Sequence, residues 1–153
     1  EWLNRHSALA RAIPNAASYV GKGFTPVALE ASLGAQQREE VLTLFQSLGM
    51  TVTVNENVLE AYAIVTGMGP TYLWPQLFEL RSFLRETGLP DEAIHVALGE
   101  MIQGAVSVMF ESDLSEEQIM DLIPVKPLAD IEPSLRETYH TRLREFLAKL
   151  RPQ

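Results

Sequence analysis

The stretch that decides the fold runs from Leu59 to Phe110, and its centre reads Thr66-Gly67-Met68-Gly69-Pro70-Thr71-Tyr72. A short apolar segment precedes this turn, and two long apolar segments follow it, separated by Gly88-Leu89-Pro90. Pro70 predicts the start of a helix, because the missing N–H of proline would have no partner in a first helical turn. Gly88 and Pro90 predict that one helix ends in a left-handed glycine and that the next begins directly afterwards.

The second long segment, Asp91 to Phe110, is predicted to be a helix that is apolar well beyond one face. Its apolar residues at helical spacing are Ile94, Ala97, Leu98, Met101, Ile102, Ala105 and Met109, and Val96, Val106, Val108 and Phe110 widen the stripe. A helix that is apolar on nearly all sides requires more than one partner to cover it.

The residues before this stretch predict short strands around one helix. Ser7–Ile13 and Gly23–Leu29 are strand candidates, although the alanine-rich first segment is also compatible with a helix. Pro26 predicts that the second strand lies at a sheet edge, because proline cannot donate to a ladder. Gly34–Leu48 predicts an amphipathic helix with Val41, Leu44, Phe45 and Leu48 on one face, and Met50–Val54 alternates like a strand.

Helices dominate the remainder. A short helix is expected over Val58–Val65, and the first long helix starts either at Pro70, with a kink at Pro75, or near Tyr72. The capping-box pattern Ser115-Glu116-Glu117-Gln118 predicts another helix start, and the last helix is expected from about Pro133 to Leu150. The predicted fold class is mainly α with a few N-terminal strands, which is α+β by element count.

Length, charge and composition exclude several classes of protein. A chain of 153 residues is long enough for one compact unit with a real core. The net charge of -8 argues against nucleic-acid or anionic-membrane partners, and the absence of cysteine excludes disulfides and is consistent with a cytoplasmic location. Glu79, Arg81, Glu100 and Gln103 interrupt the apolar segments, so no transmembrane helix is expected.

Few residues are candidates for chemistry on spacing alone. His6, His95 and His140 show no ligand spacing, so no metal site is predicted. There is no Gly-x-Ser-x-Gly motif, which argues against nucleophilic catalysis and leaves catalytic residues unassigned. The Gly67-Met68-Gly69 turn either presents backbone N–H groups to an anion or lets two helices pack closely, and the second interpretation is favoured.

Taken together, the motifs resemble those of pyrroline-5-carboxylate reductases. That family typically reads Arg-x-Met-Pro-Asn, then Ser-Gly-Ser-Gly-Pro-Ala-Tyr, then Gly-Leu-Pro and Gly-Ala-Ala. No single motif is specific, but their order and spacing match along most of the chain. The matching segments here are Arg11-Ala12-Ile13-Pro14-Asn15, Gly21–Val27, Leu44–Gly49, Leu59-Glu60-Ala61, Thr66–Tyr72, Gly88-Leu89-Pro90 and Gly104-Ala105.

The resemblance implies a domain organisation. In this family an N-terminal Rossmann domain binds NAD(P)H, and a C-terminal helical domain dimerises by intertwining its long helices. Residues 1–54 would be the end of the Rossmann-type domain, and residues 55–153 an all-helical dimerisation and substrate domain like that of 6-phosphogluconate dehydrogenases. No Gly-x-Gly-x-x-Gly follows a strand here, so we expect NADP or NAD in a full-length parent and no cofactor on this chain alone.

The resemblance also implies roles for individual residues. Asn15 matches the family asparagine near the nicotinamide, and Gly67, Gly69 and Pro70 match the turn at the active cleft. The family's substrate loop, Ser-Pro-Gly-Gly-Thr-Thr, corresponds to Pro124–Asp130, which has neither glycine nor threonine. In this segment Lys126 would attract a substrate carboxylate and Asp130 would repel one.

The resulting prediction is the C-terminal part of an NAD(P)H-dependent reductase that reduces a cyclic imine, with proline biosynthesis as the family default. The expected partners are a second copy and a small-molecule substrate, and this chain alone is expected to be inactive. Met68, which replaces a family serine, and the altered loop imply a divergent member. The alternatives are a non-catalytic dimerisation or regulatory module derived from that family, and an unrelated helical bundle.

Overall fold

The computed structural model describes residues 8–150, which divide into two compact units rather than the single unit predicted from length. The first unit contains the chain up to Tyr72 together with the chain from His140 onward, and the second is Leu73–Tyr139. The prediction of one unit was wrong because the long helices leave most of their apolar side chains exposed and do not join one common core. The domain boundary predicted after residue 54 stays a prediction.

The first unit is built on a three-stranded sheet in the order β1-β2-β3. β1 (Ala10–Ala12) pairs antiparallel with β2 (Gly23–Leu29), and β2 pairs parallel with β3 (Gly49–Thr53). β2 has the predicted bounds, whereas β1 occupies only the middle of the predicted Ser7–Ile13, of which Ser7 lies outside the described residues. Together with the helices that follow, this confirms the mainly α fold class with a few N-terminal strands.

Pro26 corrects one prediction, because it lies in the central strand β2 and not at an edge. The ladder between β1 and β2 ends at the pair Ala12 and Val27, one residue before Pro26 would be reached. Beyond that pair, the Pro26 carbonyl still accepts the Ile13 N–H at 3.1 Å. The missing proline N–H therefore falls where β1 has already ended, and it removes no rung from the sheet.

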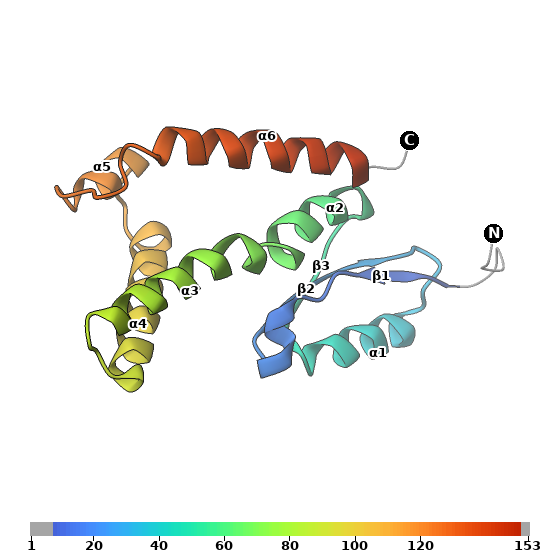
Figure 1. The fold of residues 1–153 in the computed structure, drawn as a ribbon. Helices are drawn as coiled ribbons and strands as arrows, with labels where there is room; N and C mark the ends of the chain where they lie inside the picture. Colours follow the sequence, from blue (N-terminus) through green and yellow to red (C-terminus); the bar gives the residue numbers. More distant parts are fainter. Residues whose placement is uncertain (1–7, 151–153) are drawn as a thin grey trace. The chain divides into compact units, whose positions relative to one another are not determined.

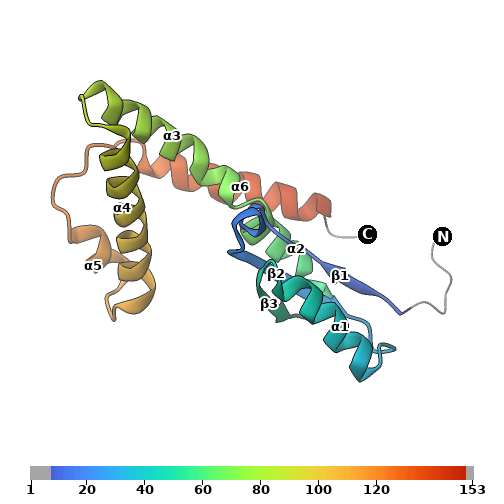
Figure 2. The same cartoon turned by 90° about the horizontal axis from the view of Figure 1, so that it is seen from below.

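Helices cover both faces of this sheet, α1 (Ala35–Gln46) on one and α2 (Leu59–Tyr62) on the other (Figures 1 and 2). Short 3-10 turns, η1 (Ala16–Val20) and η2 (Glu56–Val58), lie between these elements. Leu44 of α1 is 67% exposed, although the sequence places it on the apolar face of that helix. The buried apolar side chains of the first unit are Val27, Ala28, Leu33, Leu59 and Ile64.

The second unit consists of helices joined at the predicted turns. α3 (Pro70–Glu86) starts at Pro70, the first of the two predicted alternatives, and continues through Pro75. Gly88 has φ +84° and donates its N–H to the Arg85 carbonyl at 3.0 Å, which confirms a glycine end before α4 (Asp91–Glu111). α6 (Glu132–Leu150) continues from this unit to the end of the described chain.

The predicted capping box is present at α5 (Glu116–Asp121). The Gln118 N–H donates to the Ser115 hydroxyl at 3.2 Å, and the Ser115 N–H donates to Gln118 Oε1 at 2.9 Å. Arg136 of α6 binds both Glu116 and Glu132, so a side chain also ties α5 to α6.

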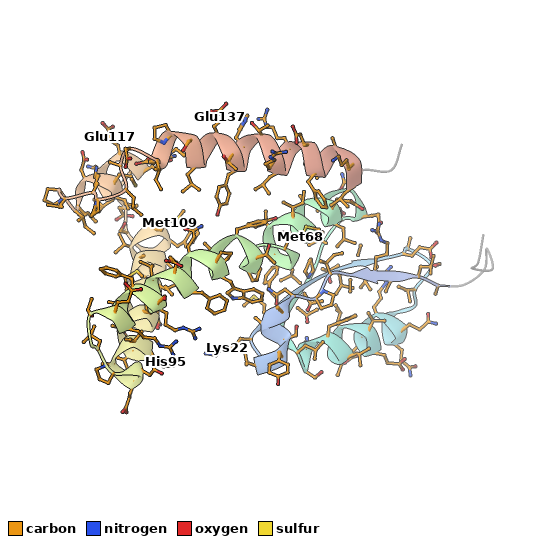
Figure 3. All side chains as sticks on the ribbon, viewed as in Figure 1. Lys22, Met68, His95, Met109, Glu117 and Glu137 are labelled. Carbon is orange, nitrogen blue, oxygen red and sulfur yellow. The ribbon has the colours of Figure 1, made fainter. Side chains whose placement is uncertain are left out.

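α4 is almost uncovered, since Ile94 is its one buried residue (Figure 3). An 18-residue window of this helix has a mean hydropathy of 1.4, so α4 is long and apolar enough to cross a membrane by composition. Core helices of water-soluble proteins pass the same test, and α4 carries Glu100 near its middle. The exposed apolar surface of α4 therefore requires a structural explanation.

Burial of the first unit's core is tested by a matched pair of leucine substitutions. Leu59→Ala removes a side chain that is 0% exposed and should lower the free energy of unfolding of the first unit by about 2–4 kcal/mol. Leu44→Ala removes a largely exposed side chain and should change it by less than about 0.5 kcal/mol. Urea denaturation followed by circular dichroism measures both, and equal effects would contradict the described core.

Candidate functional site

The turn between α2 and α3 is the best-defined candidate site in the first unit. α2 is followed by η3 (Ala63–Gly67), a π-helical turn that the sequence analysis did not predict. In this turn the Met68 N–H reaches back five residues to the Ala63 carbonyl, at 2.9 Å. Such single π turns inside helices occur frequently at functional sites.

Side-chain hydroxyls hold the turn in one conformation. The Thr66 hydroxyl donates to the Tyr62 carbonyl at 2.8 Å, and the Thr71 hydroxyl donates to the Met68 carbonyl at 2.6 Å. The Tyr72 hydroxyl donates to the Ile64 carbonyl at 2.8 Å, which ties the start of α3 back onto the π turn. These three hydrogen bonds hold the turn in a single conformation.

Gly69 lies where no side chain fits. A Cβ atom on Gly69 would be 2.0 Å from the Val65 carbonyl oxygen, far inside van der Waals contact. Neither the Val65 backbone nor the start of α3 moves away without breaking the bonds that hold the turn. The glycine that the family resemblance singled out is thus required by the close approach of two backbone segments.

The segment that leads into Asn15 packs against this turn. A Cβ atom on Gly67 would be 3.2 Å from Cγ2 of Ile13, so the glycine turn packs directly against the residues that lead into Asn15. Asn15 Oδ1 accepts the Phe24 N–H at 3.2 Å, and the Phe24 ring stacks on Tyr62 with the centroids 6.1 Å apart. The structure thus places Gly67 against Ile13, two residues before Asn15, although more than fifty residues separate them in the sequence.

Only one of the two polar groups of the Asn15 side-chain amide has a hydrogen-bond partner among the described residues. Its oxygen is used by Phe24, whereas within residues 8–150 no acceptor is found for its Nδ2 hydrogens. Arg11, in the strand that precedes Asn15, forms ion pairs with Glu56 and, at 3.1 Å, with Glu60. The hydrogen bond to Glu56 is the main cause of the raised pKa of Arg11. The local framework is therefore fixed, and it leaves one amide group to donate to a ligand.

The alternative interpretation of Gly67-Met68-Gly69, an anion site, requires free backbone N–H groups, and most of those near the turn already have partners. Backbone carbonyls already accept the N–H groups of Met68, Thr71 and Tyr72. A bound anion would have to displace these bonds. The tight-turn interpretation accounts better for the geometry.

The remaining predicted site residues belong to the second unit. Lys126 Nζ forms an ion pair with Asp121 at 3.1 Å, so its charge is already matched. Asp130 is exposed in a pair of successive turns in which the Lys126 and Leu128 carbonyls accept the Ala129 and Ile131 N–H groups. This segment offers a substrate carboxylate few free donors.

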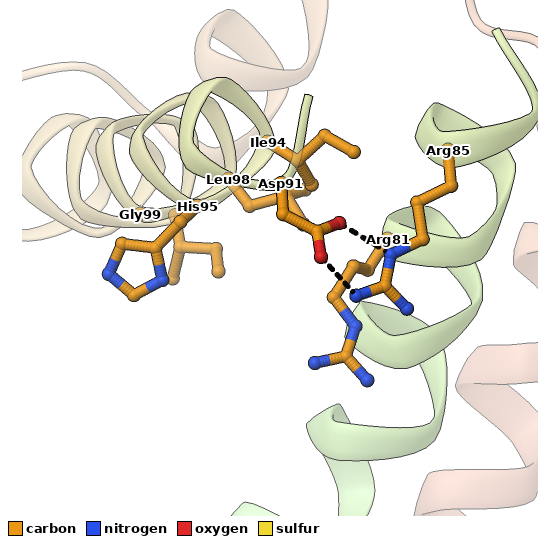
Figure 4. Close-up of a pocket in the computed structure, with 8 residues that line it drawn as sticks. Arg81, Arg85, Asp91, Ile94, His95, Leu98 and Gly99 are labelled. Carbon is orange, nitrogen blue, oxygen red and sulfur yellow. Dashed lines mark hydrogen bonds and ion pairs between the residues drawn. The ribbon is translucent and has the colours of Figure 1, made fainter. Parts of the chain in front are cut away.

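The second unit contains a hollow that the sequence analysis did not predict (Figure 4). It measures about 410 Å³, and the residues that line it are Arg81, Arg85, Asp91, Ile94, His95, Leu98, Gly99 and Ile102. The Arg85 guanidinium donates two hydrogen bonds to Asp91, at 2.7 and 2.9 Å, and thereby lowers the pKa of that carboxyl. None of the residues predicted to bind substrate or cofactor lines this hollow.

Metal chemistry finds no support among residues 8–150, where no group of three or more potential metal-ligating side chains comes together. His95 and His140 are exposed, and His6 lies outside the described residues. That no metal site exists stays a prediction.

The chain was compared with known proteins by sequence and by structure. No family model matches it. It is 28% identical over 126 residues to a pyrroline-5-carboxylate reductase of Staphylococcus haemolyticus, which covers 82% of this chain and 46% of that relative. A reductase of the same name from Mycobacterium tuberculosis is 37% identical over 94 residues, covering 61% of this chain and 29% of the relative.

The fold agrees with the sequence comparison. The structure of a Plasmodium falciparum pyrroline carboxylate reductase with NADP bound matches 95% of this chain and 60% of that chain, with a TM-score of 0.77 and 20% identity. The chain therefore shares its fold with part of that structure. The chain is a divergent relative of the pyrroline-5-carboxylate reductases, and it spans less than half the length of the curated relatives it matches.

The glycine turn is tested by substituting a second glycine as a control. Gly69→Ala should lower the free energy of unfolding of the first unit by more than about 2 kcal/mol, because the added methyl group collides with backbone. Gly34→Ala, at an ordinary φ of −67° and with nothing closer than 3.6 Å to the added carbon, should change it by less than about 1 kcal/mol. Thermal melts compare the two, and a Gly69 variant as stable as the parent would contradict the turn geometry.

Proposed function

We propose that this chain is the C-terminal part of a cytoplasmic NAD(P)H-dependent reductase that acts on a cyclic imine, with the precursor of proline as the default substrate. The cofactor would supply a hydride to the imine carbon, and the imine nitrogen would gain a proton. The chain would supply one wall of the cleft and the dimer contacts. The observation that carries this proposal is the packing of Ile13, two residues before Asn15, against Gly67 of the glycine turn.

Asn15 is suited to binding the carboxamide of a nicotinamide. Its Oδ1 atom is held by the Phe24 N–H, which fixes the plane of the side-chain amide. The Nδ2 group then points its hydrogens in a defined direction and can donate to a carboxamide oxygen.

A second candidate function, a non-catalytic dimerisation module, is favoured by the segment Pro124–Asp130. Lys126 is paired with Asp121, and the turns of this segment use the Ala129 and Ile131 N–H groups. The segment has no glycine or threonine with which to hold a carboxylate. A reductase that kept this segment would need a substrate whose carboxylate is held elsewhere, or one that has none.

The two candidates are separated by an assay on the full-length protein that carries this chain. We expect oxidation of NADPH or NADH when cyclic imines with and without a carboxylate are supplied. Asn15→Asp keeps the acceptor for Phe24 but replaces the donor with a negative oxygen, so it should raise the KM for the cofactor by about tenfold or more without lowering the melting temperature. Steady-state kinetics and a thermal melt measure both effects.

Asn57→Asp is the matched control, because it makes the same chemical change at an exposed asparagine of η2 to which no role in cofactor binding is assigned. It should leave the KM for the cofactor unchanged. If the protein neither binds nor oxidises a nicotinamide cofactor, the module interpretation replaces the reductase. If Asn15→Asp behaves like Asn57→Asp, the role assigned to Asn15 is wrong.

We also propose that the chain forms a homodimer through its long helices. The exposed apolar residues of α3 and α4 are Leu73, Trp74, Phe78, Leu80, Phe83, Val96, Met101, Val106, Met109 and Phe110. Ten large apolar side chains exposed on two successive helices are typical of the apolar core of an obligate interface.

Light scattering on the purified chain tests this assembly. We expect twice the monomer mass of 17.1 kDa at micromolar concentration, with about 2,000 Å² or more of surface buried in total. A monomer that remains soluble at that concentration would contradict the dimer. Gel filtration alone does not distinguish an extended monomer from a dimer, so the mass itself has to be measured.

A further inference from the structure

The residues directly before Asn15 have few backbone contacts with the rest of the sheet. The ladder between β1 and β2 ends before Ile13 is reached, and the Ile13 N–H then donates to the Pro26 carbonyl at 3.1 Å. Pro14 and Pro26 have no N–H group, so neither can donate a further backbone hydrogen bond between the two segments. Side chains therefore have to hold Asn15 in its place.

Three alternate residues of this segment make side-chain contacts with the rest of the first unit. Asn15 Oδ1 accepts the Phe24 N–H at 3.2 Å, and Ile13 packs against Gly67. The third residue, Arg11, forms ion pairs. Arg11 is the charged member of the three and lies at the start of the segment, so its contacts fix the point from which the chain runs to Asn15.

Arg11 joins two carboxylates through different nitrogens of one guanidinium. Nη1 donates to Glu56, and Nη2 donates to Glu60 at 3.1 Å. The Glu56 side chain is 57% exposed, whereas that of Glu60 is only 14% exposed. A shielded carboxylate requires a counter-charge, and within residues 8–150 Arg11 supplies the one ion pair of Glu60. Because the guanidinium is planar, two acceptors also fix its orientation.

Both acids belong to the elements that lead into the glycine turn. Glu56 lies in η2 and Glu60 in α2, which packs against β2 and continues directly into η3. Arg11 therefore ties the start of the Asn15 segment to the stretch of chain that ends in Gly67. Since Ile13 contacts Gly67 itself, the segment is held to this stretch at two points.

We propose that Arg11 is a positioning residue for cofactor binding: by bridging Glu56 and Glu60 it holds the segment that carries Asn15, and so keeps the Asn15 amide bonded to Phe24. This role rests on the proposed binding of a nicotinamide by Asn15 and adds the residue that holds that asparagine in place. Without the bridge, the Asn15 amide exchanges its bond with the Phe24 N–H for bonds with water. The cofactor then has to order the segment when it binds, which weakens its binding.

A pair of methionine variants separates positioning from neutralisation of a shielded charge. Arg11→Met alone should lower the melting temperature, because it leaves the Glu60 carboxylate without its counter-charge. Arg11→Met/Glu60→Met removes both charges and should recover most of that loss. In the full-length protein that carries this chain, the double variant should nevertheless keep a KM for the nicotinamide cofactor about fivefold or more above that of the parent. If Arg11 only neutralised Glu60, this KM would recover together with the melting temperature.

The exchange rate of the Phe24 amide reports the position of Asn15 without any cofactor. In this chain, the Phe24 N–H should exchange with solvent deuterium about tenfold or more faster in Arg11→Met/Glu60→Met than in the parent, because its acceptor is the Asn15 side chain. The amides of β3, on the far side of β2, should keep their rates. Nuclear magnetic resonance resolves the individual amides.

Arg38→Met is the matched control. Arg38 is a second arginine of the first unit, and its guanidinium donates to the carbonyls of Leu33 at 2.8 Å and Glu30 at 2.7 Å. Its loss should leave the KM for the cofactor and the Phe24 exchange rate unchanged, whatever its effect on the melting temperature.

Three results would overturn the role of Arg11 while the proposed function stands. They are a KM that recovers with the melting temperature in the double variant, an unchanged Phe24 exchange rate in that variant, and equal effects of Arg38→Met. If the full-length protein neither binds nor oxidises a nicotinamide cofactor, the proposed function is wrong. The Phe24 exchange rate alone then decides whether Arg11 holds Asn15 in place.

Discussion

The apolar surface that α3 and α4 leave uncovered is the constraint on which the rest of the structure depends. Each square ångström of such surface costs about 25 cal/mol to keep in water. α4 buries only Ile94, although most of its residues are apolar. The helices of the second unit therefore have the composition of a protein core but lack covering neighbours, and the proposed homodimer would supply them.

The first unit, in contrast, has a buried core of its own. Its small core around Val27 and Leu59 holds a sheet in which even the proline of the central strand costs no hydrogen bond. The π turn and the tyrosine hydroxyl bond fix the Gly69 backbone against Val65. Rigidity is what a ligand-binding wall requires, whereas the long helices of the second unit require a partner. The two proposed roles would thus fall to different units of the chain.

Features set by local chemistry were predictable from the sequence. The left-handed glycine at Gly88, the capping box at Ser115 and the bounds of β2 each depend on a few neighbouring residues, and the structure contains all three. The central position of Pro26 was not predictable, because it depends on where β1 ends on the opposite side of the sheet. The family motifs singled out Asn15 and the glycine turn, but only the fold shows that Ile13, two residues before Asn15, packs against Gly67.

The π turn and the hollow at Arg81 had no detectable signal in the sequence. A π turn differs from an α-helical turn by one inserted residue, which leaves the apolar pattern of Ala63–Gly67 almost unchanged. The hollow depends on the angle between α3 and α4 and on which arginine already has a partner. Both are properties of three-dimensional packing and not of residue order.

Hydrogen–deuterium exchange of α4 at two protein concentrations tests the central claim most directly. If a second copy covers this helix, its amides exchange slowly at high concentration and much faster when the chain is diluted below the dissociation constant of the dimer. The amides of β2, inside the first unit, would change little between the two conditions. An exchange rate of α4 that is fast and independent of concentration would show that the helix is bare in solution, and it would contradict the account.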